Sequence, residues 1–201
     1  MSIIVEHEKR RYDILEKTLD VFVDEGFGDV TFQKIADRCG VTRTTLYIYF
    51  KNKRDIFNYS IKQFLQTLEQ NINEIKNEKS LSHTEKLIMV MNMIFENLEK
   101  NPRLLSVIMD YLVHSMKMKG DFDPEYRVRR RTVRVRRILA TMLIEGVRAG
   151  EFSPSLNVKV ANELLFSFLE AASFRLAVLR RKSVDEIKDA MKLAVSRFKA
   201  S

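Results

Sequence analysis

The hydroxyl, phenol and basic side chains of residues 42–53, which read TRTTLYIYFKNK, are the groups whose types and spacing point most directly to chemistry. A threonine offers a hydrogen bond and a methyl group to the edges of DNA bases, and an arginine can bind guanine at two points. Lysine and tyrosine side chains suit contacts with backbone phosphates. This composition is typical of a surface that enters the major groove of double-stranded DNA.

The same stretch is expected to form a short helix despite its weak helix propensity. β-Branched and aromatic residues lose side-chain freedom in a helix, so neighbouring elements must support it. If Leu46 and Phe50 face inward, a step of about 100° per residue turns four side chains outward. These four are Arg43, Thr44, Tyr47 and Ile48. Thr42 then stands at the N-cap, and Tyr49 and Lys53 are placed to reach phosphates.

A second short helix and a tight turn must position that surface. Residues 32–39 are expected to form this helix, with Thr31 as its N-cap. Ala36 is small enough for two helices to cross closely, and Gly40 accepts the positive φ that a tight turn requires. The inward positions of the pair are Ile35, Ala36, Cys39, Gly40, Val41 and Leu46, with Tyr49 or Phe50 as the last one. The spacing predicts a helix-turn-helix; an ordinary corner between two helices of a bundle is the alternative.

The whole chain has the composition of a helical globular protein. Of its 201 residues, 45% are hydrophobic and 31% are charged, with only three prolines and six glycines. Helical patterns follow one another, and no strand-period segment of useful length occurs. The sequence therefore predicts an all-α fold of about nine helices. A three-helix DNA-binding domain is expected at residues 1–52 and a larger helical bundle at 53–201.

The sequence also bears on compartment. No apolar run reaches the roughly 18 residues of a membrane span, and the first residues lack the apolar core of a signal peptide. The single cysteine, Cys39, excludes an internal disulfide framework and fits a reducing compartment. We therefore expect a cytoplasmic protein without membrane insertion.

Residues 14–57 resemble the TetR/AcrR family of bacterial one-component transcriptional regulators. The resemblance lies in a first helix ending DEGF and in VTFQKIADRCGVTRTTLYIYFKNKRDIF, with its Gly-Val turn, Thr-Leu-Tyr run, aromatic pair and lysine-rich start of the next helix. It implies phosphate contacts from Thr31, Thr42, Thr45, Tyr49 and Lys53, and base contacts from Arg43, Thr44 and Tyr47. Two positions depart from the family, which often has Tyr or Trp at Ile48 and His at Tyr49. These departures put one phosphate contact in question and offer Ile48 to a base methyl group.

Two wide apolar stripes lie in the last two helical segments. The stripes are formed by Val160, Leu164, Phe168, Ala171, Ala172, Arg175 and Val178, and by Val184, Ile187, Met191, Ala194 or Val195, and Phe198. Two such helices can pair with their copies around a two-fold axis. A homodimer through residues 158–199 is therefore expected, as the resemblance also implies. The alternative is that the stripes close the core of a single chain.

The middle helices are expected to enclose a small-molecule effector. Methionines repack easily around varied apolar ligands, although they also fill ordinary cores. The candidate pocket residues are Met89, Met93, Met109 and His114. The scattered histidines suggest no metal site, and no nucleophile–base pair or phosphate-binding loop is recognisable. We therefore expect neither a cofactor nor an enzyme.

The arginine run RVRRRTVRVRR at 127–137 holds much of the excess behind the net charge of +8. On a helix, one face would carry Arg127, Arg130, Arg131, Arg134 and Arg137. A row of like charges needs an anionic partner. Neighbouring acids offer one: Glu96, Glu99, Asp110 or Glu170. An anionic effector, a membrane surface or auxiliary contacts with DNA are the other interpretations.

These patterns together predict a dimeric, sequence-specific transcriptional regulator. The function expected is that of a repressor, released from operator DNA when a small molecule binds the second domain. Two alternatives belong to other classes. One is an all-α enzyme with an appended helix-turn-helix, which the lack of convergent catalytic groups disfavours. The other is a nonspecific binder of nucleic acid or anionic surfaces that acts through Arg127–Arg137.

Overall fold

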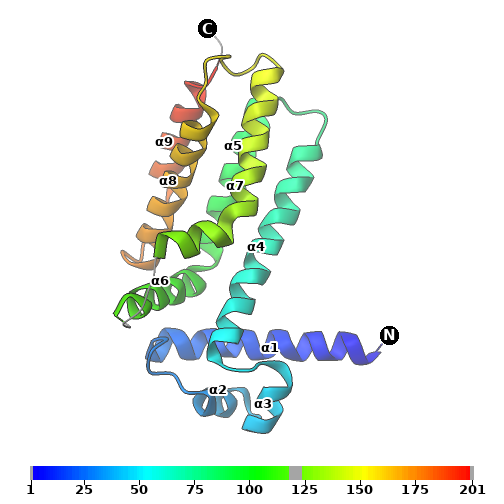
Figure 1. The fold of residues 1–201 in the computed structure, drawn as a ribbon, viewed down its shortest axis with the longest axis vertical. Helices are drawn as coiled ribbons and strands as arrows, with labels where there is room; N and C mark the ends of the chain where they lie inside the picture. The colour runs from blue at the N-terminus through cyan, green and yellow to red at the C-terminus, as the bar shows by residue number, and fades with distance from the viewer. Residues whose placement is uncertain (1, 118–123, 200–201) are drawn as a thin grey trace. The chain divides into compact units, whose positions relative to one another are not determined.

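The structure, a computed structural model, describes the backbone of residues 2–117 and 124–199 and the side chains of residues 6–116 and 128–199. Within these residues it contains α-helices and no β-strand, which confirms the predicted all-α class. The helices are α1 (Ser2–Glu25), α2 (Phe32–Cys39), α3 (Arg43–Tyr49), α4 (Lys53–Asn77), α5 (His83–Lys100), α6 (Pro102–Lys117), α7 (Pro124–Arg148), α8 (Val158–Ala177) and α9 (Asp185–Ser196) (Figure 1).

Several helix ends follow local sequence signals. Ser82 and Glu85 form a reciprocal capping box at the start of α5. Gly26 follows α1 with φ of 78°, and Gly150 follows α7 with φ of 73°. Both glycines adopt the left-handed conformation that ends a helix at little steric cost. The positions at which the chain turns are therefore written locally.

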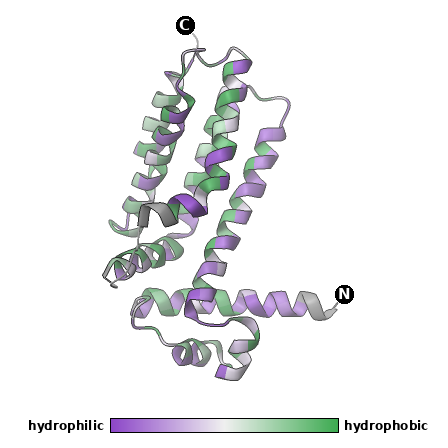
Figure 2. Ribbon diagram, viewed as in Figure 1, coloured by the Kyte–Doolittle hydropathy of each residue, from purple (hydrophilic) through white to green (hydrophobic). Residues whose placement is uncertain are grey.

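The described residues divide into two compact units. The first contains the chain up to Phe64 and α6 from Arg103 onward. In this unit α2 packs against both α1 and α3. Its core is aromatic: the ring of Phe27 lies 5.1 Å from that of Phe22 and 5.3 Å from that of Phe57. The hydrophobic colouring of α1 lies mainly in its C-terminal half (Figure 2), which is the half that reaches this core.

The second unit is a helical bundle with α5 at its centre. It begins at Leu65 within α4, and α5 contacts α7, α8 and α9 (Figure 1). The buried face of α5 consists of Leu87, Val90, Met91, Ile94, Phe95 and Leu98. Glu151, between α7 and α8, accepts hydrogen bonds from the backbone amides of His83 and Thr84 at 2.8 and 2.9 Å. A carboxylate at this position satisfies free amides of the first turn of α5.

The boundary between the units differs from the predicted division at residues 52/53. It lies inside α4, because Ile56 and Phe57 are fully buried in the core of the first unit. The chain also returns to the first unit through α6, where the ring of Tyr111 lies 4.5 Å from that of Phe57. Both features depend on long-range packing. None of the described helices combines the length and the hydrophobicity that a membrane-spanning segment requires.

Candidate nucleic-acid interface

Residues 31–50 form a helix-turn-helix. The hydroxyl of Thr31 accepts a hydrogen bond from the amide of Lys34 at 3.2 Å and caps α2. Gly40 ends α2 with φ of 68°, and the amide of Val41 donates to the carbonyl of Ala36 at 3.0 Å. The turn therefore uses the positive φ that a glycine permits.

The packing of α2 against α3 excludes solvent almost completely. Ile35, Ala36 and Leu46 are fully buried, and Phe50 is 1% exposed. Cys39 is also buried, and burial raises the pKa of its thiol. Val41 is only half-buried, because it belongs to the turn. Gly40, in the same turn, is exposed, and the other residues expected to face inward are buried.

The outer face of α3 carries the side chains expected to read bases. Arg43 and Thr44 are exposed, Tyr47 is 50% exposed and Ile48 is 67% exposed. The guanidinium of Arg43 donates a hydrogen bond to the Tyr47 hydroxyl at 3.1 Å. The Tyr47 ring lies 4.8 Å from that of Phe32 on α2. Arg43 and Tyr47 therefore form one oriented polar pair on this face.

The expected phosphate contacts flank the same helix. The Thr42 hydroxyl caps α3 by accepting from the amide of Thr45 at 3.1 Å, and it lies 2.9 Å from the Thr45 hydroxyl. Both hydroxyls keep further lone pairs for an additional partner. Tyr49 is half-buried, with its ring 4.7 Å from that of His7 on α1. The outer side of Tyr49 is thus bordered by the first helix.

Lys53 is held differently from the expectation of a phosphate contact. Its ammonium group donates to the carbonyl oxygens of Phe27, Gly28 and Val30 at 2.7, 2.8 and 2.7 Å. An ammonium group has three N–H donors, so these bonds use all of them. Burial lowers the pKa of Lys53, and the nearby charge of Asp29 opposes that effect. Lys53 fastens the start of α4 to the loop before α2.

Helix α6 holds the same loop from another direction. The carboxylate of Asp110 accepts a hydrogen bond from the amide of Phe27. The Tyr111 ring lies 4.9 Å from the Phe27 ring. A Cβ atom on Gly28 would lie 2.8 Å from Nδ1 of His114, so only a glycine fits beneath that ring without displacement. Sequence analysis missed these contacts, since they join residues about 83 positions apart.

The four candidate pocket residues are divided between the two units. Met109 and His114 lie on α6 in the first unit, and Met89 and Met93 lie on α5 in the second. Met89 is 49% exposed. The sulfur of Met93 lies 3.2 Å from the side-chain nitrogen of Asn97. The shared pocket stays a prediction, whereas His114 has a defined structural neighbour in Gly28.

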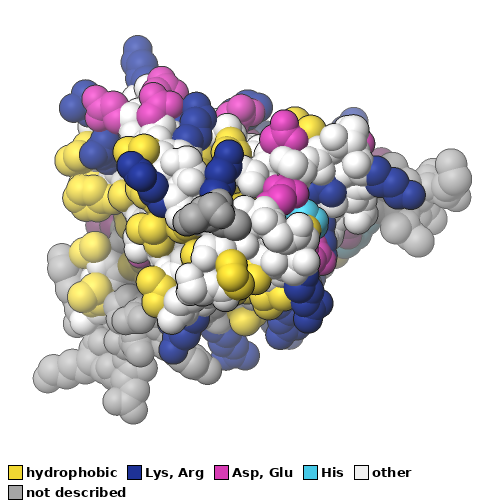
Figure 3. Space-filling view, turned by 90° about the horizontal axis from the view of Figure 1, so that it is seen from above, with side chains coloured by type: hydrophobic (Ala, Val, Ile, Leu, Met, Phe, Trp, Pro, Cys, Tyr) yellow, Lys and Arg dark blue, Asp and Glu magenta, His cyan; other side chains and the backbone are white. Residues whose placement is uncertain are grey.

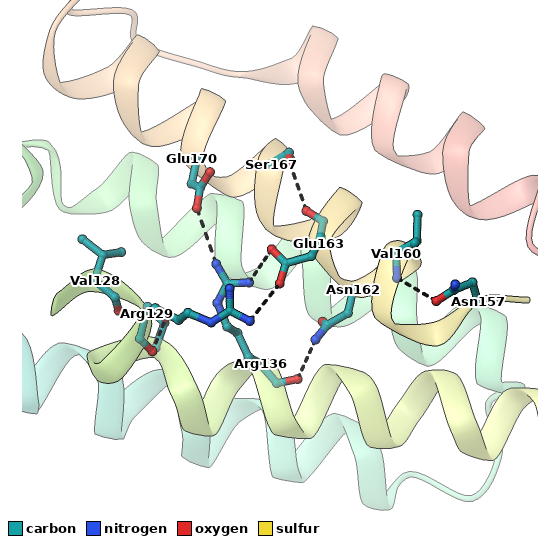
Figure 4. Close-up of polar contacts among 10 residues, drawn as sticks. Val128, Arg129, Arg136, Asn157, Val160, Asn162, Glu163, Ser167 and Glu170 are labelled. Atoms are coloured by element: carbon teal, nitrogen blue, oxygen red, sulfur yellow. Dashed lines mark hydrogen bonds and ion pairs between the residues drawn. The ribbon is translucent and has the colours of Figure 1, made fainter. Parts of the chain in front are cut away.

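The arginines of α7 lie on two faces of the helix, and the two faces differ in their ion-pair partners. Arg136, which was not assigned to the predicted row, is only 12% exposed; it pairs with Glu163 at 3.0 Å and Glu170 at 3.5 Å. Its guanidinium also lies 3.7 Å from the ring centre of Phe166. Arg129 reaches Glu163 as well, so two arginines converge on one carboxylate of α8 (Figure 4).

The other face carries the predicted row. Arg130 and Arg137 are exposed and form no ion pair within the described part of the chain. Arg134 pairs with Glu69 of α4 at 3.5 Å. The side chain of Arg127 lies outside the described residues. Arg131 is half-buried and does have a bonding partner.

Of the acids expected to answer the row, Glu170 does pair with an α7 arginine, although with Arg136 and not with a member of the row. Asp110 instead binds the Phe27 amide. Glu99 binds the ammonium group of Lys188 at 2.9 Å and the Val184 amide at 3.0 Å. Glu96 is exposed. Three of the four predicted acids therefore bind groups other than the arginines of the predicted row.

The apolar stripes of α8 and α9 differ in solvent exposure. The stripe of α9 is buried within the chain: Val184, Ile187, Met191, Val195 and Phe198. On α8, Val160 is 61% exposed and Leu164 is 39% exposed, whereas Ala172 is completely buried. Further exposed apolar side chains near the end of α8 and on α9 are Phe174, Val178, Leu179 and Leu193. Exposed hydrophobic side chains are visible on the surface in Figure 3.

Comparison with known protein families covers most of the chain. The family described as bacterial regulatory proteins, tetR family, matches residues 14–59. The family described as YsiA-like protein, C-terminal region, matches residues 57–174. The two matches overlap at residues 57–59, within α4. The resemblance therefore extends well beyond the helix-turn-helix.

Two individual regulators are similar to this chain over about 160 residues each. The chain is 28% identical over 161 residues to the fatty acid metabolism regulator protein of Bacillus subtilis, covering 78% of each chain. It is 28% identical over 160 residues to the transcriptional repressor KstR2 of Mycolicibacterium smegmatis, covering 80% of this chain and 74% of the relative. Both relatives are described as regulators.

Solved structures agree with the fold. The transcriptional regulator FadR from Bacillus subtilis, in complex with stearoyl-CoA, superposes with a TM-score of 0.73 at 25% identity, covering 92% of this chain and 98% of that one. KstR2 of Mycobacterium tuberculosis superposes with a TM-score of 0.69 at 18% identity, covering 96% of each chain. The latter likeness concerns the fold alone.

Proposed function

The chain belongs to the TetR family of bacterial regulatory proteins and is a DNA-binding transcriptional regulator, and from that premise we propose that it represses genes until an acyl-CoA releases it from its operator. The observation that carries the proposal is the exposed, hydrogen-bonded pair of Arg43 and Tyr47 on the outer face of α3. The pair faces outward because the buried Phe50 and the contact of α3 with α2 fix the opposite face. Its place of action is the cytoplasm, where operator DNA lies.

The exposed face of α3 divides into two kinds of contact. Arg43 and Tyr47 supply donors and acceptors for base edges, and Thr44 and Ile48 offer methyl groups to thymine. Thr31, Thr42, Thr45 and Tyr49 lie beside this face and contact phosphates. Lys53 positions the helix-turn-helix through the loop carbonyls instead of contacting DNA.

The regulator acts as a homodimer through α8 and α9. Support comes from the exposed apolar side chains of α8, which a partner would cover, and from Leu193 on α9 at 63% exposure. A two-fold dimer presents two recognition helices to successive major grooves. The buried stripe of α9 serves a different purpose, since it closes the core of one protomer.

The effector proposed is a long-chain acyl-CoA. Two relatives support this class: a regulator of fatty acid metabolism, and FadR, whose structure was solved with stearoyl-CoA. An acyl chain suits a bundle whose α5 contributes leucine, methionine and phenylalanine to the interior. The phosphates of CoA suit a chain whose net charge is +8.

Release requires that the effector and the operator bias one shared conformational element. The loop around Phe27 is that element, because Lys53 of α4 and Asp110 of α6 both bind its backbone. Of these two helices, α4 continues into the second unit from Leu65 onward, and α6 follows directly along the chain on Pro102, the last residue of that part of the second unit. An effector-induced shift in either helix would displace the loop and hence α2.

The test begins with duplexes from the DNA upstream of the protein's own gene, since such regulators often control a neighbouring gene. Fluorescence anisotropy should show one duplex bound much more tightly than an unrelated one at physiological salt, and stearoyl-CoA should release it. Equal, salt-dominated affinity for both duplexes would instead indicate nonspecific binding. Specific binding without release by stearoyl-CoA would reject the effector class and retain the regulator.

A further inference from the structure

The exposed arginine row consists of Arg130, Arg134 and Arg137 on α7. Their spacing of four and three residues places them on one face of the helix, spanning about 10 Å along its axis. The Arg134 side chain is 71% exposed, and its ion-pair partner, Glu69, is 20% exposed. The row is therefore a cationic surface with one carboxylate at its edge.

We propose that the exposed arginine row binds the phosphate groups of the effector's CoA part and that this binding draws Arg134 away from Glu69. The inference rests on the proposed acyl-CoA function and adds to it the site of the phosphates and the contact that they replace. Guanidinium groups form paired, charge-assisted hydrogen bonds with phosphate oxygens. A pyrophosphate and a ribose phosphate together provide the extended anionic group that three spaced arginines require.

The Arg134–Glu69 pair makes the row sensitive to such an anion. Its separation of 3.5 Å and the exposure of Arg134 characterise a weak surface ion pair, which a multiply charged phosphate can displace. When Arg134 leaves, the carboxylate of Glu69, which is 20% exposed, loses this ion pair. Binding at the row therefore loosens one link between α4 and α7.

A second ion pair between the same helices identifies the row as the variable link. Lys76 of α4 pairs with Glu145 of α7 at 3.0 Å, and neither residue belongs to the row. This contact stays in place while Arg134 changes partner. Helix α4 begins at Lys53, which is hydrogen-bonded to the loop before α2. Loss of the ion pair at Glu69 therefore acts on the same continuous helix that holds this loop.

The experiment measures binding of free CoA, dephospho-CoA and stearoyl-CoA by isothermal titration calorimetry. The double variant Arg134→Gln/Arg137→Gln should weaken binding of CoA about ten- to a hundredfold, given the strength of charge-assisted hydrogen bonds. It should also reduce the preference for CoA over dephospho-CoA. The matched control is Arg129→Gln, on the same helix but paired with Glu163, which should change neither quantity.

The competition between Glu69 and the phosphates for Arg134 is tested by a variant that should strengthen CoA binding. Glu69→Gln frees Arg134 while keeping the side-chain shape, so CoA should bind about two- to fivefold more tightly, as expected for a weak surface pair. The control Lys76→Met breaks the other ion pair and should leave CoA affinity unchanged. Circular dichroism must first show that each variant is folded. Unchanged or weaker CoA binding by folded Glu69→Gln overturns the competition.

The remaining outcomes separate this inference from the proposed function. If stearoyl-CoA binds the double variant and the wild type equally and releases the operator from both, the row is not the phosphate site and the effector class stands. If the wild type binds no acyl-CoA, both proposals fail. If the ligand-free double variant loses affinity for operator and unrelated DNA alike, the row binds DNA, and the inference is overturned.

Discussion

The ammonium nitrogen of Lys53 lies 2.7 Å from the carbonyl oxygen of Val30. This contact joins the first residue of α4 to the residue that precedes the N-cap of α2. Together with the bonds to Phe27 and Gly28, it makes the loop before the helix-turn-helix a structural extension of α4. The orientation of the recognition surface therefore depends on a lysine that a sequence pattern would assign to DNA.

Replacing Lys53 with methionine should separate these two roles. The change keeps most of the side-chain stem but removes three hydrogen bonds, so the free energy of unfolding should fall by about 1–3 kcal/mol. Operator affinity should fall too, while the dependence of log Kd on log salt stays unchanged. A salt slope smaller by about one would instead show a lost phosphate contact. Urea unfolding and anisotropy titrations at several salt concentrations supply the two readouts.

Removing the Tyr47 hydroxyl should alter sequence preference. Tyr47→Phe keeps the ring against Phe32 but removes the acceptor for Arg43. A base-reading contact is expected to be worth about 1–3 kcal/mol at one position of the operator. Titration of single-base operator variants should show relaxed discrimination at that position, with an unchanged salt slope. Uniformly weaker binding to every duplex would contradict the assignment.

The exposed face of α8 predicts which substitution disrupts the dimer. Leu164→Glu places a charge on a surface that the partner would cover, and burying that charge is costly. Sedimentation at micromolar concentration should show a folded monomer with reduced operator affinity. Ala172, a residue of the predicted interface stripe, is completely buried in the protomer. Ala172→Val should therefore lower protomer stability, by about 1–3 kcal/mol for overpacking. A Leu164→Glu variant that remains dimeric would place the interface elsewhere.

Glu151 predicts a pH-dependent contribution to stability. Burial raises the pKa of its carboxyl, but the hydrogen bonds from the amides of His83 and Thr84 and from the Thr84 hydroxyl lower it more, leaving the net pKa below 4.5. A depressed pKa stabilises the fold above the unfolded-state value, and that stabilisation disappears as pH falls through the folded-state value. Glu151→Gln should cost about 1–2 kcal/mol at pH 7. Urea unfolding at a series of pH values below 4.5 should show the difference between variant and wild type shrinking as the pH falls. A difference that stays constant over the series would contradict this origin.

Asp110 predicts a variant that binds both ligands but responds poorly. Asp110→Ala removes the acceptor for the Phe27 amide from α6. Operator affinity without effector should stay near that of the wild type, because Lys53 still holds the loop. The factor by which stearoyl-CoA weakens operator binding, typically about 5–150 for coupled sites, should approach one. Val113→Ala, at an exposed position of α6, is the control. An unchanged factor in Asp110→Ala would exclude this contact from the coupling.

Elements with local causes could be predicted from the order of residues alone. The caps at Thr31 and Thr42, the left-handed turn at Gly40 and the inward spacing of Leu46 and Phe50 all involve residues a few positions apart. Their patterns were sufficient to predict the helix-turn-helix and the outward face of α3. Local periodicity likewise predicted an all-α chain, because hydrogen bonds within a helix join near neighbours.

The partners of several side chains depend on long-range packing and could not be predicted from local patterns. Lys53 binds loop carbonyls, Asp110 binds an amide of the first unit, and the stripe of α9 faces its own core. An apolar or charged stripe shows that a helix has a special face but not what covers it. The answer depends on contacts between residues that are distant along the chain. The domain boundary inside α4 also depends on such long-range contacts, because the ring of Phe57 packs against Tyr111 of α6 and Phe27 of the loop after α1.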